Sequence, residues 1–141
     1  MKKNLILAAF IILVVDQLTK FFIIKNFFSG EALKLSSFLQ IKYFTNTGAA
    51  FSILQDQATL LAWFSIVVIG FILFYYDKIS KKTHIPVGLV LGGILGNLID
   101  RISYGYVIDF IDFSFWPAFN IADSALFVGV IWLVVYISKS K

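Results

Sequence analysis

The sequence predicts a mainly α-helical membrane protein with four transmembrane helices and a small antiparallel β-sheet on the extracytoplasmic side. Of its 141 residues, 60% are hydrophobic and only 14% are charged, and the mean hydropathy is +0.89. A soluble domain of this length could not bury so much apolar surface, because small folds leave a large share of their area exposed. In addition, apolar runs of bilayer length recur along the chain, with clusters of cations between them.

Four apolar segments have, or nearly have, the length of about 20 residues that a hydrocarbon core requires. They are 4–24, 58–76, 85–102 and 116–137. The first also resembles a secretory signal peptide, because two lysines precede its apolar run. No small-residue cleavage site follows it, so we predict a retained first span. Together the four segments predict one integral-membrane domain over residues 1–141.

The cations predict the orientation of these spans. An even number of spans places both termini on one side of the membrane. Most of the twelve cations fall at the termini or in the connection between the second and third spans: Lys2, Lys3, Lys78, Lys81, Lys82, Lys139 and Lys141. The positive-inside rule therefore predicts cytoplasmic termini and outward-facing connections at 25–57 and 103–115. The net charge of +4 is explained by this topology, so we expect no nucleic-acid partner.

The 25–57 connection carries a strand pattern. In "FLQIKYF", Leu39, Ile41 and Tyr43 alternate with polar residues, which is the period of a half-buried strand. "NTG" offers a turn, and "AAFSIL" at 49–54 is expected to return as the partner strand. The predicted sheet thus covers about 33–55, between the first and second helices.

Composition also limits the chemistry. The chain has no cysteine, which excludes disulfides, thiolate nucleophiles and cysteine-based metal sites. Its single histidine, His84, follows "KISKKT", and we expect it to be solvated in a loop. No metal and no cofactor are expected.

Ionisable groups at membrane depth are costly, so each is a candidate functional residue. Asp16 and Lys20 are spaced i, i+4 on the first span, which favours an ion pair. That pair either only neutralises two charges or helps to shape a site.

The third span has two rows of residues. Gly88, Gly92 and Gly96 form a stripe that favours close helix packing. Gly93, Asn97 and Arg101 form a neighbouring row, so Asn97 and Arg101 should point the same way. Asp100 is expected to be a local charge partner of Arg101.

The fourth span contains Asp123, six residues beyond Pro117 and therefore about 9 Å along the helix from it. Its own helix offers no cation, so Asp123 must face the bundle interior and needs a partner. The segment "YVIDFIDF" at 106–113 supplies Asp109 and Asp112 at a suitable depth.

Two carboxylates in a low-dielectric site cannot both ionise easily, so one keeps its proton. An aspartic protease uses this arrangement: the carboxylate takes a proton from water and the acid polarises the scissile carbonyl. The same pair would suit a proton or cation relay, and the pair alone leaves both functions open.

Five motifs in order make the resemblance specific: "DQLTK" (16–20), "NTGAAF" (46–51), "GGILGNLIDR" (92–101), "VIDF" (107–110) and "FNIADSA" (119–125). Together they resemble the lipoprotein signal peptidase family, also called signal peptidase II, over essentially the whole chain. The length, the four predicted spans and their orientation also match that family. The resemblance implies a bacterial inner-membrane aspartic endopeptidase. It would remove the signal peptide from diacylglyceryl-modified prolipoproteins, just before the lipid-modified cysteine.

The resemblance also implies roles for individual residues. The catalytic pair falls on Asp109 and Asp123, and Asp112 becomes a bystander that structures a loop or an interface. Positions that line or support the site are Asn46, Gly48, Asn97, Arg101, Asn120, Asp16 and Lys20. The expected partners are prolipoprotein substrates and membrane lipid, and the protein is expected to act as a monomer. The rival functions are a small proton- or cation-translocating protein and a non-catalytic assembly protein.

Overall fold

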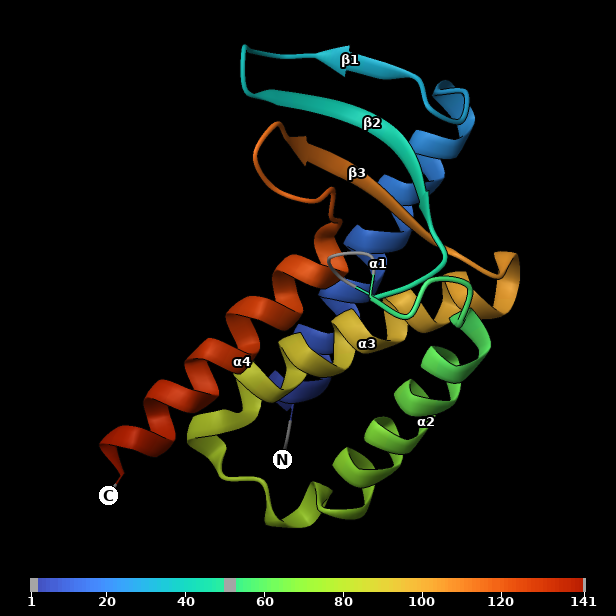
Figure 1. Ribbon diagram of the computed structural model, residues 1–141. Helices are drawn as coiled ribbons and strands as arrows, with labels where there is room; N and C mark the ends of the chain where they lie inside the picture. The colour runs from blue at the N-terminus through green and yellow to red at the C-terminus, as the bar shows by residue number, and fades with distance from the viewer. Residues whose placement is uncertain (1–2, 50–52, 141) are drawn as a thin grey trace.

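The computed structural model describes residues 3–49 and 53–140. Within these residues there are three strands and four α-helices, α1 (Lys3–Asn26), α2 (Ala58–Phe74), α3 (His84–Tyr104) and α4 (Ile121–Lys139). The strands are β1 (Ala32–Lys34), β2 (Leu39–Asn46) and β3 (Val107–Phe113), and two short 3₁₀ turns, Tyr76–Lys78 and Lys81–Thr83, link α2 to α3. Figure 1 shows the sheet at one end of the helices, with the start of α1, the α2–α3 link and the end of α4 at the other.

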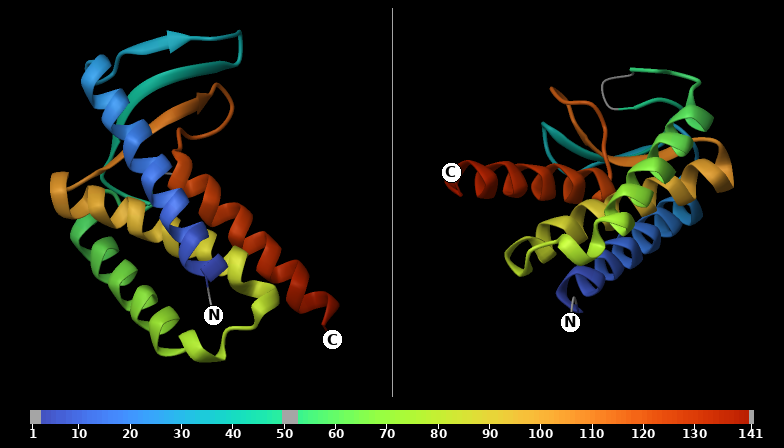
Figure 2. Two further views of the ribbon diagram at one scale, coloured as in Figure 1. Left: turned by 180° about the vertical axis from the view of Figure 1, so that it is seen from behind. Right: turned by 90° about the horizontal axis from the view of Figure 1, so that it is seen from below.

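Helix α3 is the centre of the bundle, since it packs against α1, α2 and α4. Figure 2 shows α1 lying across one side of α3, while α2 and α4 diverge on either side of it. Backbone approach at the glycines makes this packing possible. A Cβ atom at Gly92 would lie 2.7 Å from the carbonyl oxygen of Ala9 on α1, and one at Gly93 would lie 2.5 Å from that of Ala122 on α4. The predicted packing stripe is therefore confirmed.

The outer faces of the helices are apolar. Leucine, isoleucine, valine and phenylalanine side chains are exposed along α1, α2 and α4, as expected for contact with lipid. Three helical stretches, 3–26, 81–104 and 121–139, are long and apolar enough to cross a membrane. Helix α2 has 17 residues, about 26 Å at 1.5 Å per residue, and is thus somewhat shorter than a typical hydrocarbon core. The chain is a multi-pass membrane protein.

The sheet differs from its predicted form. Strand β2 lies in the middle and pairs antiparallel with β1 and β3, so one strand comes from the connection between α3 and α4. The prediction that 49–54 forms the partner strand is wrong for the residues of this segment that the structure describes, 49, 53 and 54. Leu54 and Asp56 have positive φ, and Ala49 N donates to the carbonyl of Ile53 at 2.7 Å, which closes a turn. Residues 50–52 lie outside the described part of the chain.

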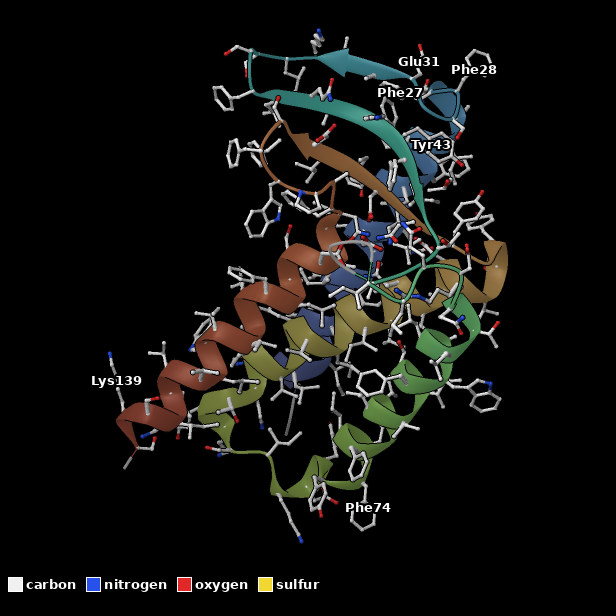
Figure 3. All side chains as sticks on the ribbon, in the orientation of Figure 1. Phe27, Phe28, Glu31, Tyr43, Phe74 and Lys139 are labelled. Carbon is white, nitrogen blue, oxygen red and sulfur yellow. The ribbon has the colours of Figure 1, made fainter. Side chains whose placement is uncertain are left out.

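A small apolar core joins the sheet to α1. Ile23 of α1, Tyr43 of β2, and Ile108 and Phe110 of β3 are buried together, and Phe27 packs against them. Figure 3 shows Tyr43 and Phe27 at the junction between the end of α1 and the sheet. This contact sets the position of β3 over the bundle.

His84 is not a solvated loop residue. It is the first residue of α3, it is only 5% exposed, and its Nε2 atom has no hydrogen-bond partner among the described residues. The 3₁₀ turn Lys81–Thr83 leads directly into α3. His84 consequently starts the helix one turn before Gly88, which packs on α1.

The glycine packing gives a stability prediction. Replacing Gly92 by Ala should lower the free energy of unfolding in detergent by about 1–3 kcal/mol, because the new methyl group meets the α1 backbone. Gly70→Ala on α2 is the matched control: a Cβ there meets nothing within 4 Å, so better helix propensity should stabilise the protein by about 0.5–1 kcal/mol. Thermal unfolding of both variants checks the difference. Equal midpoints would contradict the packing.

Candidate active site

A cavity of about 1070 Å³ lies below the sheet, between β2, the β3–α4 connection, α3 and α4. One end is polar and includes Asn46, Asn97, Arg101 and Asp123. The wall along α4 is apolar and is made by Leu126, Phe127, Val130 and Ile131. The cavity therefore joins a polar head to an apolar channel.

Asp109 lies in β3 behind the polar head and is only 1% exposed. Asn46 is opposite Val107 in the ladder, so its side chain is a diagonal neighbour of Asp109 on the same face. Asn46 Nδ2 donates to Asp109 Oδ2 at 3.0 Å, and Asn120 Nδ2 donates to Oδ1 at 2.7 Å. Both carboxyl oxygens of Asp109 thus accept a hydrogen bond from an amide.

Asp123 lies in the first turn of α4 and lines the cavity. It forms a capping box with Asn120: the Asp123 backbone N–H donates to Asn120 Oδ1 at 2.8 Å, and Asp123 Oδ2 accepts from the Asn120 N–H at 3.3 Å. Asn97 Nδ2 donates to Asp123 Oδ1 at 2.8 Å. Asn120 therefore contacts both carboxylates, and it brings Asp109 and Asp123 to the same point.

Burial changes the titration of Asp109. Removal of the carboxyl group from water, followed by the nearby charge of Asp123, raises the pKa of Asp109 to about 7. The hydrogen bonds from Asn46 and Asn120 and the charge of Lys20 act in the opposite direction. Asp109 can therefore hold a proton near neutral pH.

A buried ion cluster lies directly behind the pair of carboxylates. Lys20 Nζ is 2.8 Å from Asp16 Oδ2 and 2.8 Å from Asp100 Oδ2, and it donates to Asn97 Oδ1 at 3.0 Å. The predicted Asp16–Lys20 ion pair is confirmed. Asp100 was expected to pair with Arg101, but its carboxylate contacts Lys20, because it lies on the buried side of α3 while Arg101 lines the cavity.

The ion cluster also holds the backbone beside each carboxylate of the pair. Asp100 Oδ2 accepts from the N–H of Ile108, which precedes Asp109. Asp16 Oδ1 accepts from the N–H of Ala122, which precedes Asp123. Sequence reasoning missed these two bonds, and it also missed Gln17, whose amide donates to Asp100 Oδ1 at 3.0 Å. Gln17 lies in the "DQLTK" motif, directly after Asp16, and that motif was the signal that could have found it.

Arg101 and Gly48 meet at the cavity wall. Arg101 Nη2 donates to the carbonyl oxygen of Gly48 at 3.1 Å, while its Nε is buried and has no hydrogen-bond partner among the described residues. Gly48 N donates to Asn46 Oδ1 at 3.0 Å. A Cβ at Gly48 would lie 2.6 Å from the carbonyl oxygen of Ile53, so the turn requires glycine at this position.

Asp112 is separate from this arrangement. It is a strand residue of β3 rather than a loop residue, and it lies opposite Gln40 in the ladder. Gln40 Nε2 donates to Asp112 Oδ2 at 2.6 Å. Asp112 lines the cavity, and its hydrogen bond goes to Gln40 rather than to the groups that surround Asp109 and Asp123. Among residues 3–49 and 53–140, no group of three or more acidic, histidine or cysteine side chains could hold a metal ion.

An apolar bundle that holds one carboxylate at the head of a cavity and a second one directly behind it, both bonded to one asparagine, defines a membrane enzyme of the acid–base type. A sequence profile described as Signal peptidase (SPase) II matches residues 8–139. The chain belongs to this family, the aspartic signal peptidases II.

Individual proteins agree with this assignment. The chain is 38% identical to a lipoprotein signal peptidase of Halothermothrix orenii, with 93% of this chain and 92% of the relative covered. It is 44% identical to a lipoprotein signal peptidase of Syntrophus aciditrophicus, over 100% and 98% of the two chains. A solved bacterial membrane enzyme superposes with a TM-score of 0.91 at 32% identity, and the match covers 97% of this chain and 88% of that one.

Proposed function

We propose that this chain is a membrane-embedded aspartic endopeptidase that removes the signal peptide from diacylglyceryl-modified prolipoproteins, just before the lipid-modified cysteine. Family membership supports peptide cleavage over proton or cation translocation. The observation that carries the proposal is the link through Asn120, whose side chain contacts both Asp109 and Asp123 at the polar head of the cavity.

In the proposed mechanism, Asp109 and Asp123 share one proton. The charged carboxylate takes a proton from a water molecule, which attacks the carbonyl carbon before the modified cysteine. The protonated carboxyl group donates a hydrogen bond to the carbonyl oxygen as negative charge develops there. The carboxyl group that took the proton from water then gives a proton to the amide nitrogen of the modified cysteine, and the C–N bond breaks to release the amine and the carboxyl end of the signal peptide. The side chains of three asparagines, Asn46, Asn97 and Asn120, orient the pair. One step needs a carboxylate that accepts a proton and the other needs a carboxylic acid that donates a hydrogen bond, so one of the two groups must be ionised and the other protonated.

The remaining site residues support this pair and the substrate. Arg101 bonds the Gly48 carbonyl and so holds the turn after β2 against the cavity. Asp16 and Lys20 belong to the ion cluster behind the pair. The sheet holds the exit side of the peptide, and the acyl chains of the substrate remain in lipid.

We further propose a single-domain monomer with four spans, cytoplasmic termini and a site near the outer face of the bacterial inner membrane. The sheet lies at the end of the bundle opposite the start of α1 and the end of α4, which supports this orientation (Figure 1). The lysines near those ends and in the α2–α3 link are the cations expected on the cytoplasmic side.

Removing either carboxyl group should abolish cleavage. Asp109→Asn and Asp123→Asn are each expected to lower kcat by at least about 100-fold, because each eliminates one of the two proton-transfer groups. Turnover of a lipidated prolipoprotein by purified protein is the measurement, with thermal unfolding as a check on folding. Asp112→Asn is the matched control and should retain substantial activity, since Asn can still bond Gln40. Near-normal turnover by Asp109→Asn or Asp123→Asn would exclude the assignment.

Substrate selectivity tests the function itself. A diacylglyceryl-modified prolipoprotein and its unmodified counterpart should be compared at equal concentration in the same detergent or bilayer. We expect cleavage of the modified form only, because the site lies where acyl chains can stay in lipid. Equal cleavage of both forms would contradict lipid recognition, and flux in proteoliposomes without any cleavage would instead favour translocation.

The pH dependence follows from Asp109. Its pKa is raised to about 7, so it is protonated below this pH and ionised above it. If Asp109 must hold the shared proton, kcat/KM should fall as the pH rises through about 7. A pH–rate profile of the folded enzyme measures this, and a profile that stays flat up to pH 9 would show that no such proton is needed.

A further inference from the structure

The orientation of two buried amides is determined by the groups around them. An ammonium and a backbone N–H can only donate, so the amide atom that faces either of them must be the carbonyl oxygen. Lys20 Nζ lies 3.0 Å from Asn97, which fixes Oδ1 on that side. Nδ2 of Asn97 is then the atom that faces Asp123 Oδ1, at 2.8 Å.

The same reasoning applies to Asn120. The backbone N–H of Asp123 lies 2.8 Å from Asn120 and fixes its Oδ1 on that side. Its Nδ2 therefore points toward Asp109 Oδ1, at 2.7 Å, and toward Asn97 Oδ1, at 3.1 Å. The hydrogen bonds thus run in one direction, from the Lys20 ammonium through Asn97 to Asp123.

The three protons of Lys20 are all used in this arrangement. Two of them meet Asp16 and Asp100, and the third meets Asn97. Lys20 is 1% exposed, so bulk solvent does not reach its ammonium group. The ammonium therefore holds Asn97 in its donating orientation toward Asp123.

Asp109 and Asp123 also differ in surroundings. Asp123 lies in the first turn of α4, where the helix dipole favours negative charge, and it lines the cavity. Asp109 lies on a strand behind the cavity wall and is 1% exposed. Each carboxyl group accepts two hydrogen bonds, but only Asp123 combines them with a helix N-terminus, a place on the cavity wall and the donor chain from Lys20.

We propose that Lys20 is a positioning residue that fixes the Asn97 amide toward Asp123, so that Asp123 is the charged member of the pair and Asp109 the protonated one. This inference rests on the proposed peptidase function and adds the roles of the two carboxyl groups. Asp123 takes the proton from water, and Asp109 donates its hydrogen bond to the scissile carbonyl.

The two limbs of the pH–rate profile separate the roles. The acidic limb reports protonation of the base, and the alkaline limb reports loss of the proton from the acid. The other charged groups near the pair are Asp16 and Lys20 of α1 and Asp100 and Arg101 of α3. A neutral-for-neutral change leaves all of these charges in place, so Asn97→Leu and Asn46→Leu isolate the two hydrogen bonds.

Asn97→Leu removes a donor from Asp123, and Asn46→Leu removes a donor from Asp109. We expect Asn97→Leu to move the acidic limb of kcat/KM to higher pH by about one to two units, with the alkaline limb in place. Asn46→Leu should instead move the alkaline limb to higher pH. The reverse pattern, or movement of both limbs in both variants, would overturn the assignment.

Lys20→Gln should move the acidic limb to higher pH, as Asn97→Leu does, and should also move the alkaline limb upward, because the charge of Lys20 lowers the pKa of Asp109. Lys20→Gln and Asn97→Leu together should displace the acidic limb by less than the sum of their separate effects. Gln17→Leu is the structural control: it loses bonds to Asp16 and Asp100 but does not touch Asn97, so it should lower the unfolding temperature without moving either limb. If Lys20→Gln does not fold, the double variant Lys20→Gln, Asp100→Asn replaces it in this test, because it removes the cation together with one of the carboxylates paired with it. Additive displacement, or an acidic limb that stays in place, would exclude Lys20 as the positioning residue.

Where turnover is too slow, ¹³C-carboxyl NMR of aspartate-labelled protein in detergent follows the same titrations, with Asp109→Asn and Asp123→Asn assigning the two signals. The wild-type assay separates this inference from the function on which it rests. Absence of cleavage by the wild-type chain would refute the peptidase. Cleavage by the wild type with unmoved limbs in Asn97→Leu would refute only the roles proposed here.

Discussion

The charge of Lys20 inside an apolar bundle is the constraint on which the site depends. A buried ammonium without partners costs several kcal/mol, so it persists only where acceptors surround it. Three oxygens do so, from Asp16, Asp100 and Asn97. Two of them come from α3, so the cluster closes only when α3 lies directly against α1. The glycines of α3 permit that approach, because a Cβ at Gly92 or Gly96 would meet atoms of α1 within 3 Å.

The ion cluster extends into the site through the backbone. Each of its two carboxylates accepts from the N–H of the residue before one member of the pair: Asp100 from Ile108, and Asp16 from Ala122. The start of β3 and the start of α4 are therefore attached to the same buried charge. Strand β3 and helix α4 thus present Asp109 and Asp123 to the same side-chain amide, that of Asn120. The charged side chains that neutralise one another in the ion cluster therefore also define the geometry of the site.

The cavity combines two environments that suit a lipid-bearing peptide. Its polar head has backbone and amide groups that can orient a peptide, and its wall along α4 is apolar. Phe127, Val130 and Ile131 of this wall are also exposed on the outside of α4, so the apolar wall reaches the lipid-facing surface of the bundle. Helices α2 and α4 diverge on either side of α3 (Figure 2). A substrate that keeps its acyl chains in the membrane can therefore bring its backbone to the carboxylates without moving those chains into water.

Local patterns in the sequence determined the membrane class, the positions of the apolar helices, the Asp16–Lys20 ion pair and the packing face of α3. These features depend on composition and on spacings of three or four residues, which a helix converts directly into neighbours. The need of Asp123 for a partner also followed from the sequence, since no cation lies near it in its own helix. Only the tertiary structure decided that β3 pairs with β2, that Asp100 contacts Lys20 rather than Arg101, and that His84 is buried. Each of these depends on which segments meet across the fold, and residues 80 apart in the chain carry no local periodicity that records their contact.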